Sequence, residues 1–275
     1  MNKLLSANYI RLRKDKFFWL GMAFMFAAGI FFPVMRYMDA KESNTINNID
    51  NGFFGCALFI GIIMAVFCSL FIGTEYSDGT IRNKIVVGHK RVSIYLTNLF
   101  TTSLVSIAMC VIFFVPYLCI GIPLLGFFEM NIKSVLLFAL TILLLAIAFS
   151  SIFTLISMLN HNKVISAIIC ILLSFGLLLT GTILNKMLEA PEIIPSYSIG
   201  ANGEATASEM QNPKFLDGTK REIVQFVYDF IPGGQAIQCA AINAENLHML
   251  PIYSIIIIVF STGAGLFFFK KKELK

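Results

Sequence analysis

Six long apolar runs constrain this chain more than any other feature, because a helix of about 20 apolar residues matches the thickness of a bilayer. The runs lie at about 17–35, 53–74, 93–124, 134–158, 164–185 and 251–269. The chain is 57% hydrophobic and 13% charged, whereas about a quarter of residues are charged in soluble domains. The sequence therefore predicts an all-α polytopic membrane protein with six transmembrane helices, in a single transmembrane domain over residues 1–275.

The third apolar run predicts a helix that leaves the hydrocarbon layer. Residues 93–128 as one straight helix would extend ~54 Å, whereas the hydrocarbon core is ~30 Å thick. The run begins with polar residues, including Thr97 and Asn98, which favour a start in the membrane interface. Pro116 and Pro123 are expected to kink or end the helix near the opposite face.

The distribution of Lys and Arg predicts the orientation of the spans. The chain contains 21 Lys and Arg residues and has a net charge of +5. The two short connections on one side contain only Arg36, Lys41 and Lys133, whereas the N-terminal arm, residues 75–92 and the C-terminal tail are rich in cations. Because short cytoplasmic segments carry an excess of Lys and Arg, both termini are predicted to be cytoplasmic. Membrane topology thus accounts for the positive charge without a nucleic-acid partner.

Residues 1–16 are expected to form an amphipathic helix on the membrane surface. Cations and apolar residues are interspersed there at roughly helical spacing, which is typical of interfacial helices. A basic start before an apolar run also resembles a signal peptide. The run 17–35 is long for a signal peptide and has no convincing cleavage site, so the sequence favours a retained span.

The connection between the second and third spans, residues 75–92, predicts a short helix. Asp78 is expected to cap its N-terminus, because a carboxylate accepts from free backbone N–H groups there. Ile81 and Ile85 lie one turn apart and share a face, and Gly88 supplies the stop. The result is an amphipathic helix of about ten residues that lies along the membrane or against a partner. The alternative is a simple membrane-surface loop with the expected positive charge.

Glu75 is the ionisable residue nearest to the interior of a predicted span, and the central parts of the spans contain none. Arg82 follows seven residues later, which is two turns of a continuous helix. We therefore expect an interfacial Glu75–Arg82 ion pair, which contributes about 1 kcal/mol or less when solvated and orients the short helix. The absence of ionisable residues at mid-span argues against a proton-coupled carrier.

The inner half of the fourth span carries small hydroxyl side chains. They are Ser150, Ser151, Thr154 and Ser157. Such residues let helices approach closely and form hydrogen bonds across an interface. The sequence favours this packing role. The alternative is that these side chains line the translocation path.

Residues 186–250 form the largest polar segment. The first part is rich in Pro, Gly, Ser and Asn, which predicts irregular structure. The second part predicts two short amphipathic helices around a turn at Pro232, Gly233 and Gly234. This hairpin either packs on the bundle as a cap or dips into the outer leaflet.

Catalytic and metal-binding motifs are missing from the sequence. It contains no Walker A, H-E-x-x-H or G-x-S-x-G pattern, and its three His residues are widely separated. No C-x-x-C spacing occurs, and the six Cys residues are expected to be small buried thiols. The chain is therefore predicted to be neither an enzyme nor the carrier of a metal or cofactor.

A specific motif covers the end of the second span and the connection that follows. Eight positions of G-x-E-Y-x-x-G-T-I-R-x-K are occupied by Gly73, Glu75, Tyr76, Gly79, Thr80, Ile81, Arg82 and Lys84. This motif resembles the signature of type-2 ABC exporter permeases, and the six-span layout is similar. The resemblance implies that this segment, from Glu75 through Asp78 to Lys84, docks on a separate ABC ATPase subunit and couples to it.

The resemblance also implies the wider assembly. Two ATPase subunits would carry ATP and Mg, and a second permease, identical or related, would complete the unit. The location implied is the bacterial plasma membrane, and the helices before the last span would shape an outer gate.

Two functions remain open at this level. The first is the permease of an ATP-driven exporter, and the compact layout resembles exporters of antimicrobial peptides or drugs. The second is a membrane scaffold or sensor that binds a cytoplasmic partner through the same loop without transport. Co-purification of an active ATPase distinguishes the two.

Overall fold

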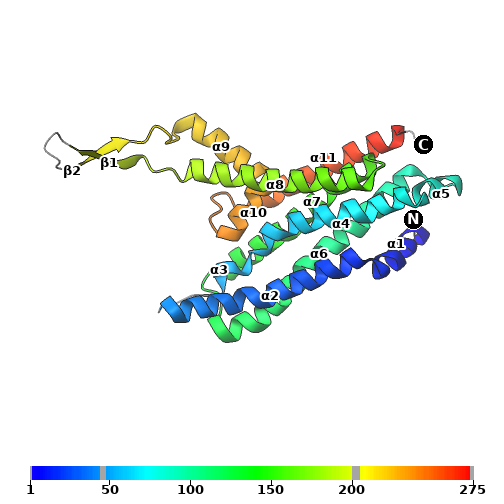
Figure 1. Cartoon of the computed structure of the whole chain (residues 1–275), viewed down its shortest axis with the longest axis horizontal. Coiled ribbons are helices and arrows are strands. Elements are labelled where there is room, and N and C mark those ends of the chain that lie inside the picture. The colour runs from blue at the N-terminus through cyan, green and yellow to red at the C-terminus, as the bar shows by residue number, and fades with distance from the viewer. Residues whose placement is uncertain (1, 44–47, 200–204, 273–275) are drawn as a thin grey trace.

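Six long helices form a bundle in the computed structural model, which describes residues 2–43, 48–199 and 205–272 (Figure 1). Each is long and apolar enough to cross a membrane. They are α2 (Lys16–Ser43), α4 (Cys56–Ser77), α6 (Arg91–Leu125), α7 (Ile132–Leu159), α8 (Lys163–Leu188) and α11 (Leu250–Lys271). Five of the predicted spans lie within one of them, and the second, 53–74, begins three residues before α4, so the all-α fold with six spans is confirmed.

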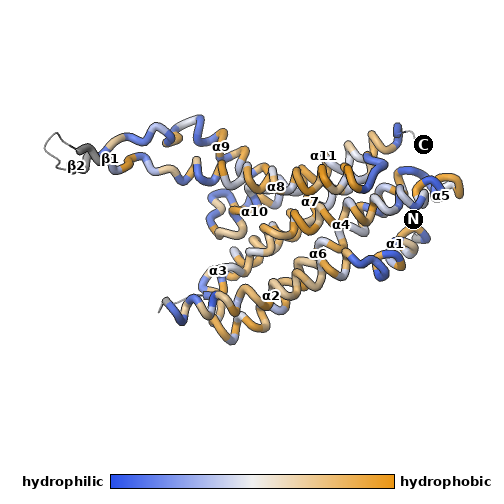
Figure 2. The backbone as a smooth tube through the Cα atoms, viewed as in Figure 1, coloured by the Kyte–Doolittle hydropathy of each residue, from blue (hydrophilic) through white to orange (hydrophobic). Residues whose placement is uncertain are grey.

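Helix α4 is the most enclosed of the six. It packs against α7 and α8, while α7 also packs on α6 and α11, and α2 packs on α6. In the most apolar stretch of each helix, 67% of α4 is buried, compared with 22% of α2, α8 and α11. The long helices are apolar along their length (Figure 2), so α2, α8 and α11 present apolar outer faces, as expected of helices that meet lipid.

Shorter elements lie at the two ends of the bundle. The end that carries both termini, here called the terminal end, also holds α1 (Asn2–Lys14) and α5 (Thr80–Val86) (Figure 1). The half away from the termini holds the other short elements. They are α3 (Asp50–Phe53), α9 (Gly218–Phe230), α10 (Pro232–Ala241) and the strands β1 (Ile193–Ile199) and β2 (Ala205–Gln211).

One helix extends well beyond its predicted span, and another passes through two prolines and ends where predicted. Helix α2 continues to Ser43, whereas the first span was predicted to end at about residue 35, so that predicted end was wrong. Helix α6 runs through Pro116 and Pro123 and ends at Leu125, where Gly126 follows with φ +83°. Proline is tolerated in membrane helices because neighbouring helices and local adjustments satisfy the freed backbone groups.

The segment after α8 is more regular than predicted. Strands β1 and β2 pair antiparallel, with Ile193 opposite Gln211 and Ile199 opposite Ala205. The prediction of irregular structure was wrong here because β1 is rich in Ile and contains Tyr197, and these residue types favour strands.

Among the cysteines, Cys119 is exposed and the other five are buried, so the expectation of buried thiols was wrong for Cys119.

Candidate functional site

The connection from α4 to α5 turns at a glycine in the left-handed region. Gly79 has φ +66° and occupies the residue before α5, where its carbonyl accepts from Asn83 N at 3.0 Å. Asp78 still belongs to the last turn of α4, because its N–H donates to Thr74 O at 2.9 Å. The prediction that Asp78 caps the short helix was therefore wrong. The hydroxyl of Thr80 donates to Glu75 O at 3.0 Å and closes the turn.

Helix α5 has seven residues, shorter than the predicted ten, and ends at Val86, two residues before the predicted stop at Gly88. Gly88 has φ +95°, and its N–H donates to Ile85 O at 2.9 Å. Ile81 is 1% exposed and Ile85 is half-buried, which confirms their shared inward face. Val86 and Val87, by contrast, are 78% and 77% exposed at the tip of the loop.

Glu75 lies at the centre of a buried charge cluster. Its carboxylate is 1% exposed and forms ion pairs with Lys84 of α5 and Arg11 of α1. The other carboxylate oxygen accepts from Asn98 Nδ2 of α6 at 2.9 Å. Asn8 Nδ2 of α1 donates to Asn98 Oδ1 at 2.7 Å. Asn8, Arg11, Glu75, Lys84 and Asn98 are called the polar cluster below.

The predicted Glu75–Arg82 pair is absent from the part of the chain that the structure describes. Arg82 is exposed, and Lys84 takes the place beside Glu75. The two-turn spacing did not apply because the left-handed residue Gly79 interrupts the helical phase between α4 and α5. The Glu75–Lys84 ion pair is also buried, whereas the predicted pair was expected to be solvated. An unpaired buried carboxylate would cost several kcal/mol, so the two cations and Asn98 are required to hold it there.

Arg11 joins α1 to α4 through a cation–π contact and a hydrogen bond as well as through its ion pair with Glu75. Its guanidinium lies 3.7 Å from the centre of the Phe71 ring, and Nη2 donates to Phe71 O at 3.1 Å. A planar guanidinium can combine a carboxylate contact with stacking, which an ammonium cannot. The polar cluster therefore ties four helices together at the terminal end: α1, α4, α5 and α6.

The chain's last described residue packs beside Tyr76. The Tyr76 hydroxyl donates to Met158 O at the end of α7, and Lys272 Nζ donates to the same carbonyl at 3.1 Å. Lys272 Nζ also lies 3.0 Å from the Tyr76 hydroxyl. Burial lowers the pKa of Lys272 from its usual 10.5 to about 8. Arg91 holds the end of α11 by donating to Lys270 O at 3.1 Å and to Phe269 O at 3.3 Å.

A cavity of about 420 Å³ opens between α5, the end of α4 and the connection from α7 to α8. Its lining combines acidic, basic and aromatic groups. The residues are Glu75, Tyr76, Ser77, Gly79, Ile81, Arg82 and His161. The structure thus brings five of the sequence-predicted docking residues to one cavity. Of the other three, Lys84 lies in the polar cluster, Thr80 closes the turn and Asp78 is exposed.

The four predicted hydroxyl side chains in the second half of α7 are fully buried, and three of them link α7 to other helices. Thr154 lies 2.9 Å from the Thr102 hydroxyl of α6, and Ser151 lies 2.6 Å from the Ser261 hydroxyl of α11. Ser157 lies 3.9 Å from Cys170 Sγ of α8, and Ser150 donates within α7 to Ala146 O at 2.9 Å. Within this one chain, these hydroxyl groups form contacts between helices, as expected for a role in packing.

The predicted turn at Pro232, Gly233 and Gly234 lies one residue too late. The chain turns at Ile231, which is extended with φ −75° and ψ 138°, and Pro232 begins α10. Proline is favoured at the first position of a helix because its φ is already helical. A Cβ on Gly233 would lie 1.9 Å from Leu177 O, so glycine lets α10 pack against the backbone of α8.

Sequence reasoning missed Asn8, Arg11 and Lys272 as members of this site. Asn8 and Asn98 are 90 residues apart in the chain. One sequence signal was available, namely Asn98 among the polar residues in the first turns of α6. Among the described residues, no group of three or more His, Cys, Asp or Glu side chains is placed to hold a metal ion.

These features define a multi-pass α-helical membrane protein in which a short helix between the second and third spans is tied to the bundle by buried charge. The family model described as "ABC-2 family transporter protein" matches residues 4–177, and the chain belongs to that family. The match runs from α1 into α8 and includes the motif around Glu75. Members are the membrane subunits of ABC transporters, with the ATPase on a separate chain. A sequence comparison with curated proteins gives no significant match.

Proposed function

We propose that this chain is the permease subunit of an ATP-driven exporter and that α5 receives the ATPase subunit. The observation that carries the proposal is the pair Val86 and Val87, both more than three-quarters exposed at the tip of a polar loop. Arg82 and Asn83 are also exposed on α5. The exposed valines could pack into an apolar groove of a partner, while the guanidinium of Arg82 could bind a carboxylate at the rim of that groove.

The polar cluster supports a coupling role for the same helix. Lys84 anchors α5 to Glu75, and Glu75 is held in turn by Arg11 of α1 and Asn98 of α6. A force applied to the exposed face of α5 therefore reaches three helices through ion pairs and hydrogen bonds. Such a connected arrangement is what a permease needs to convert movement of an ATPase into rearrangement of its spans.

The proposed unit contains two ATPase subunits, which carry ATP and Mg, and a second permease, identical or related. The apolar outer faces of α2, α8 and α11 leave room for that second permease. The proposed substrate is an antimicrobial peptide or drug, on the basis of the compact six-span layout alone. The proposed location is the bacterial plasma membrane.

We propose that the terminal end faces the cytoplasm. Cysteine labelling in a variant without Cys119 and Cys239 tests this. A cysteine at Lys133 should react with an impermeant thiol reagent in intact cells, whereas a cysteine at Asn83 should react only after the membrane is opened. Both positions are exposed. Asn83 lies on α5 at the terminal end, whereas Lys133 lies in the first turn of α7, which follows the far end of α6. The reverse pattern would overturn the orientation and the docking assignment with it.

The docking proposal is tested by affinity purification from the native host. The variant Arg82→Glu/Val86→Asp/Val87→Asp should lose the ATPase while it remains inserted and monodisperse, because all three side chains are exposed. A matched control at the opposite end is Ile132→Asp/Lys133→Glu, where Ile132 is 61% exposed. Equal recovery of the ATPase with both variants would remove α5 from the interface.

A further inference from the structure

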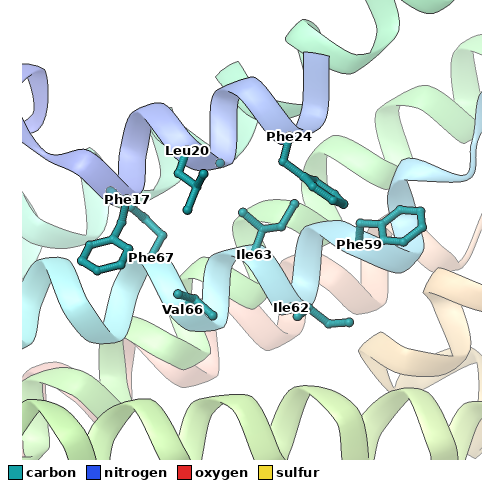
Figure 3. A pocket seen from close by; sticks show the side chains of 9 residues that line it. Phe17, Leu20, Phe24, Phe59, Ile62, Ile63, Val66 and Phe67 are labelled. Atoms are coloured by element: carbon teal, nitrogen blue, oxygen red, sulfur yellow. The ribbon is translucent and has the colours of Figure 1, made fainter. Parts of the chain in front are cut away.

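A groove lined only by apolar side chains runs between α2 and α4 (Figure 3). Its cavity volume is about 380 Å³. Phe17, Leu20 and Phe24 form the wall on α2, and Phe59, Ile63 and Phe67 lie on the α4 wall. Leu20 is 67% exposed and Phe17 is 44% exposed, so the groove opens sideways toward the bilayer.

The groove follows the direction of the spans. Phe17 and Phe67 lie together at one end, and Phe24 and Phe59 lie together at the other (Figure 3). Seven residues separate Phe17 from Phe24, which corresponds to about 10 Å along a helix. The end at Phe17 is the one nearest to α1 and the terminal end of the bundle.

Three exposed cations lie at that end of the groove. Arg13 and Lys14 end α1, and Lys16 begins α2 one turn before Leu20, on the same helix face. Within the described residues, none of the three forms an ion pair. The intervening Asp15 accepts from Phe18 N at 2.9 Å and so caps α2.

Trp19 marks the level of the lipid headgroups beside these cations. It is 57% exposed, and its Nε1 donates to Arg13 O at 3.0 Å. Tryptophan is enriched where the hydrocarbon layer meets the headgroups. The cations therefore lie at headgroup depth, and the groove below them lies at the depth of acyl chains.

We propose that this groove holds one acyl chain of an anionic phospholipid, with the lipid phosphate beside Lys16 and Lys14. The groove is lined only by apolar side chains along about 10 Å of helix, which suits a hydrocarbon chain. The exposed cations at one end of the groove suit the headgroup of a lipid, so a phospholipid is favoured over a helix of a second copy. The unpaired cations at its headgroup end select for negative charge.

Native mass spectrometry of the purified protein tests the proposal. The probe is an equimolar mixture of phosphatidylglycerol and phosphatidylcholine with identical acyl chains. The protein should retain phosphatidylglycerol preferentially. Lys14→Glu/Lys16→Glu should reduce that preference by tenfold or more, since each cation at an anionic surface contributes about fivefold. Lys41→Glu/Lys133→Glu, at the other end of the bundle, is the charge-matched control and should keep the preference.

A second variant separates the groove from the surface charge. Leu20→Trp fills the groove and should lower the number of retained lipids while the cations remain in place. Leu136→Trp is its control, because Leu136 is 63% exposed on the apolar outer face of α7. Unchanged phosphatidylglycerol preference in the charge variant, or unchanged lipid retention in Leu20→Trp, would overturn the proposal. A disulfide between chains that carry Leu20→Cys in a bilayer would also overturn it, by making the groove an interface between copies.

Discussion

Lys84 and Glu75 are nine residues apart in the chain, and their side chains meet across the turn at Gly79 in a site from which water is largely excluded. Glu75 is fully buried, and the Lys84 side chain is 16% exposed. This contact fixes the direction of α5 relative to α4. It also places the only acidic member of the polar cluster between two cations, Lys84 and Arg11.

Neutralising Glu75 should destabilise the protein strongly. Glu75→Gln leaves Arg11 and Lys84 without a counter-charge, which typically costs about 3–5 kcal/mol for a buried pair. Lys84→Met should cost less, because Arg11 remains beside the carboxylate. Thermal unfolding in detergent measures both changes. Arg82→Met is the control and should shift stability by less than about 0.5 kcal/mol, since Arg82 is exposed. Wild-type stability in Glu75→Gln would show that the cluster contributes little.

Substitution of Gly79 should act through the backbone alone. No atom lies within 4 Å of a Cβ added at Gly79, but its φ of +66° disfavours side chains. Gly79→Ala should therefore cost about 1–2 kcal/mol, and Gly79→Asn less, because Asn visits this region more readily. Gly79→Pro cannot adopt a positive φ and should release the ATPase on purification.

A helical glycine with equal space provides the comparison for Gly79. Gly176 in α8 also has no atom near an added Cβ, and its φ lies outside the left-handed region. Gly176→Ala should be neutral or stabilising by about 0.5–1 kcal/mol. Equal effects of alanine at Gly79 and Gly176 would remove the conformational role assigned to Gly79.

Local pattern was enough to predict the spans and the inward face of α5. Hydropathy identifies the spans because a bilayer accepts few other backbone arrangements. The spacing of Ile81 and Ile85 and the stop at Gly88 are properties of one helix. Whether Arg82 or Lys84 pairs with Glu75 depends on the left-handed turn at Gly79. This turn interrupts the helical periodicity, so residue spacing alone could not predict the partner.

Contacts between distant segments could not be predicted from local pattern. Arg11 reaches Phe71 across 60 residues, and Lys272 reaches Met158 across 114. Both depend on how α1 and α11 pack in three dimensions. The sequence suggested an interfacial arm and a cationic tail, and the structure adds that each of these segments donates hydrogen bonds to the bundle.

The Lys272 amine should make stability depend on pH. Its pKa falls from 10.5 to about 8 on burial, so the unfolded chain binds more protons than the folded chain between these values. The burial penalty is therefore fully present below about pH 8 and is relieved as the pH rises toward 10.5. The stability of the wild type minus that of Lys272→Met should increase across this window. A flat difference from pH 7 to 10 would show that Lys272 is solvated.

Transport should depend on ATP and not on a proton gradient. A proton-driven carrier needs a group that changes charge within the membrane, and such groups are retained there only with a function. Glu75 is the buried carboxylate of the second span, but it lies at the terminal end and is held by two cations. Reconstituted vesicles that contain the permease, its ATPase and ATP should therefore continue transport after an uncoupler is added. Replacement of the Walker lysine in the ATPase should stop it. If flux instead followed the pH gradient without ATP, Glu75 would become the first candidate for a proton carrier, and Glu75→Gln would then be expected to abolish the pH dependence.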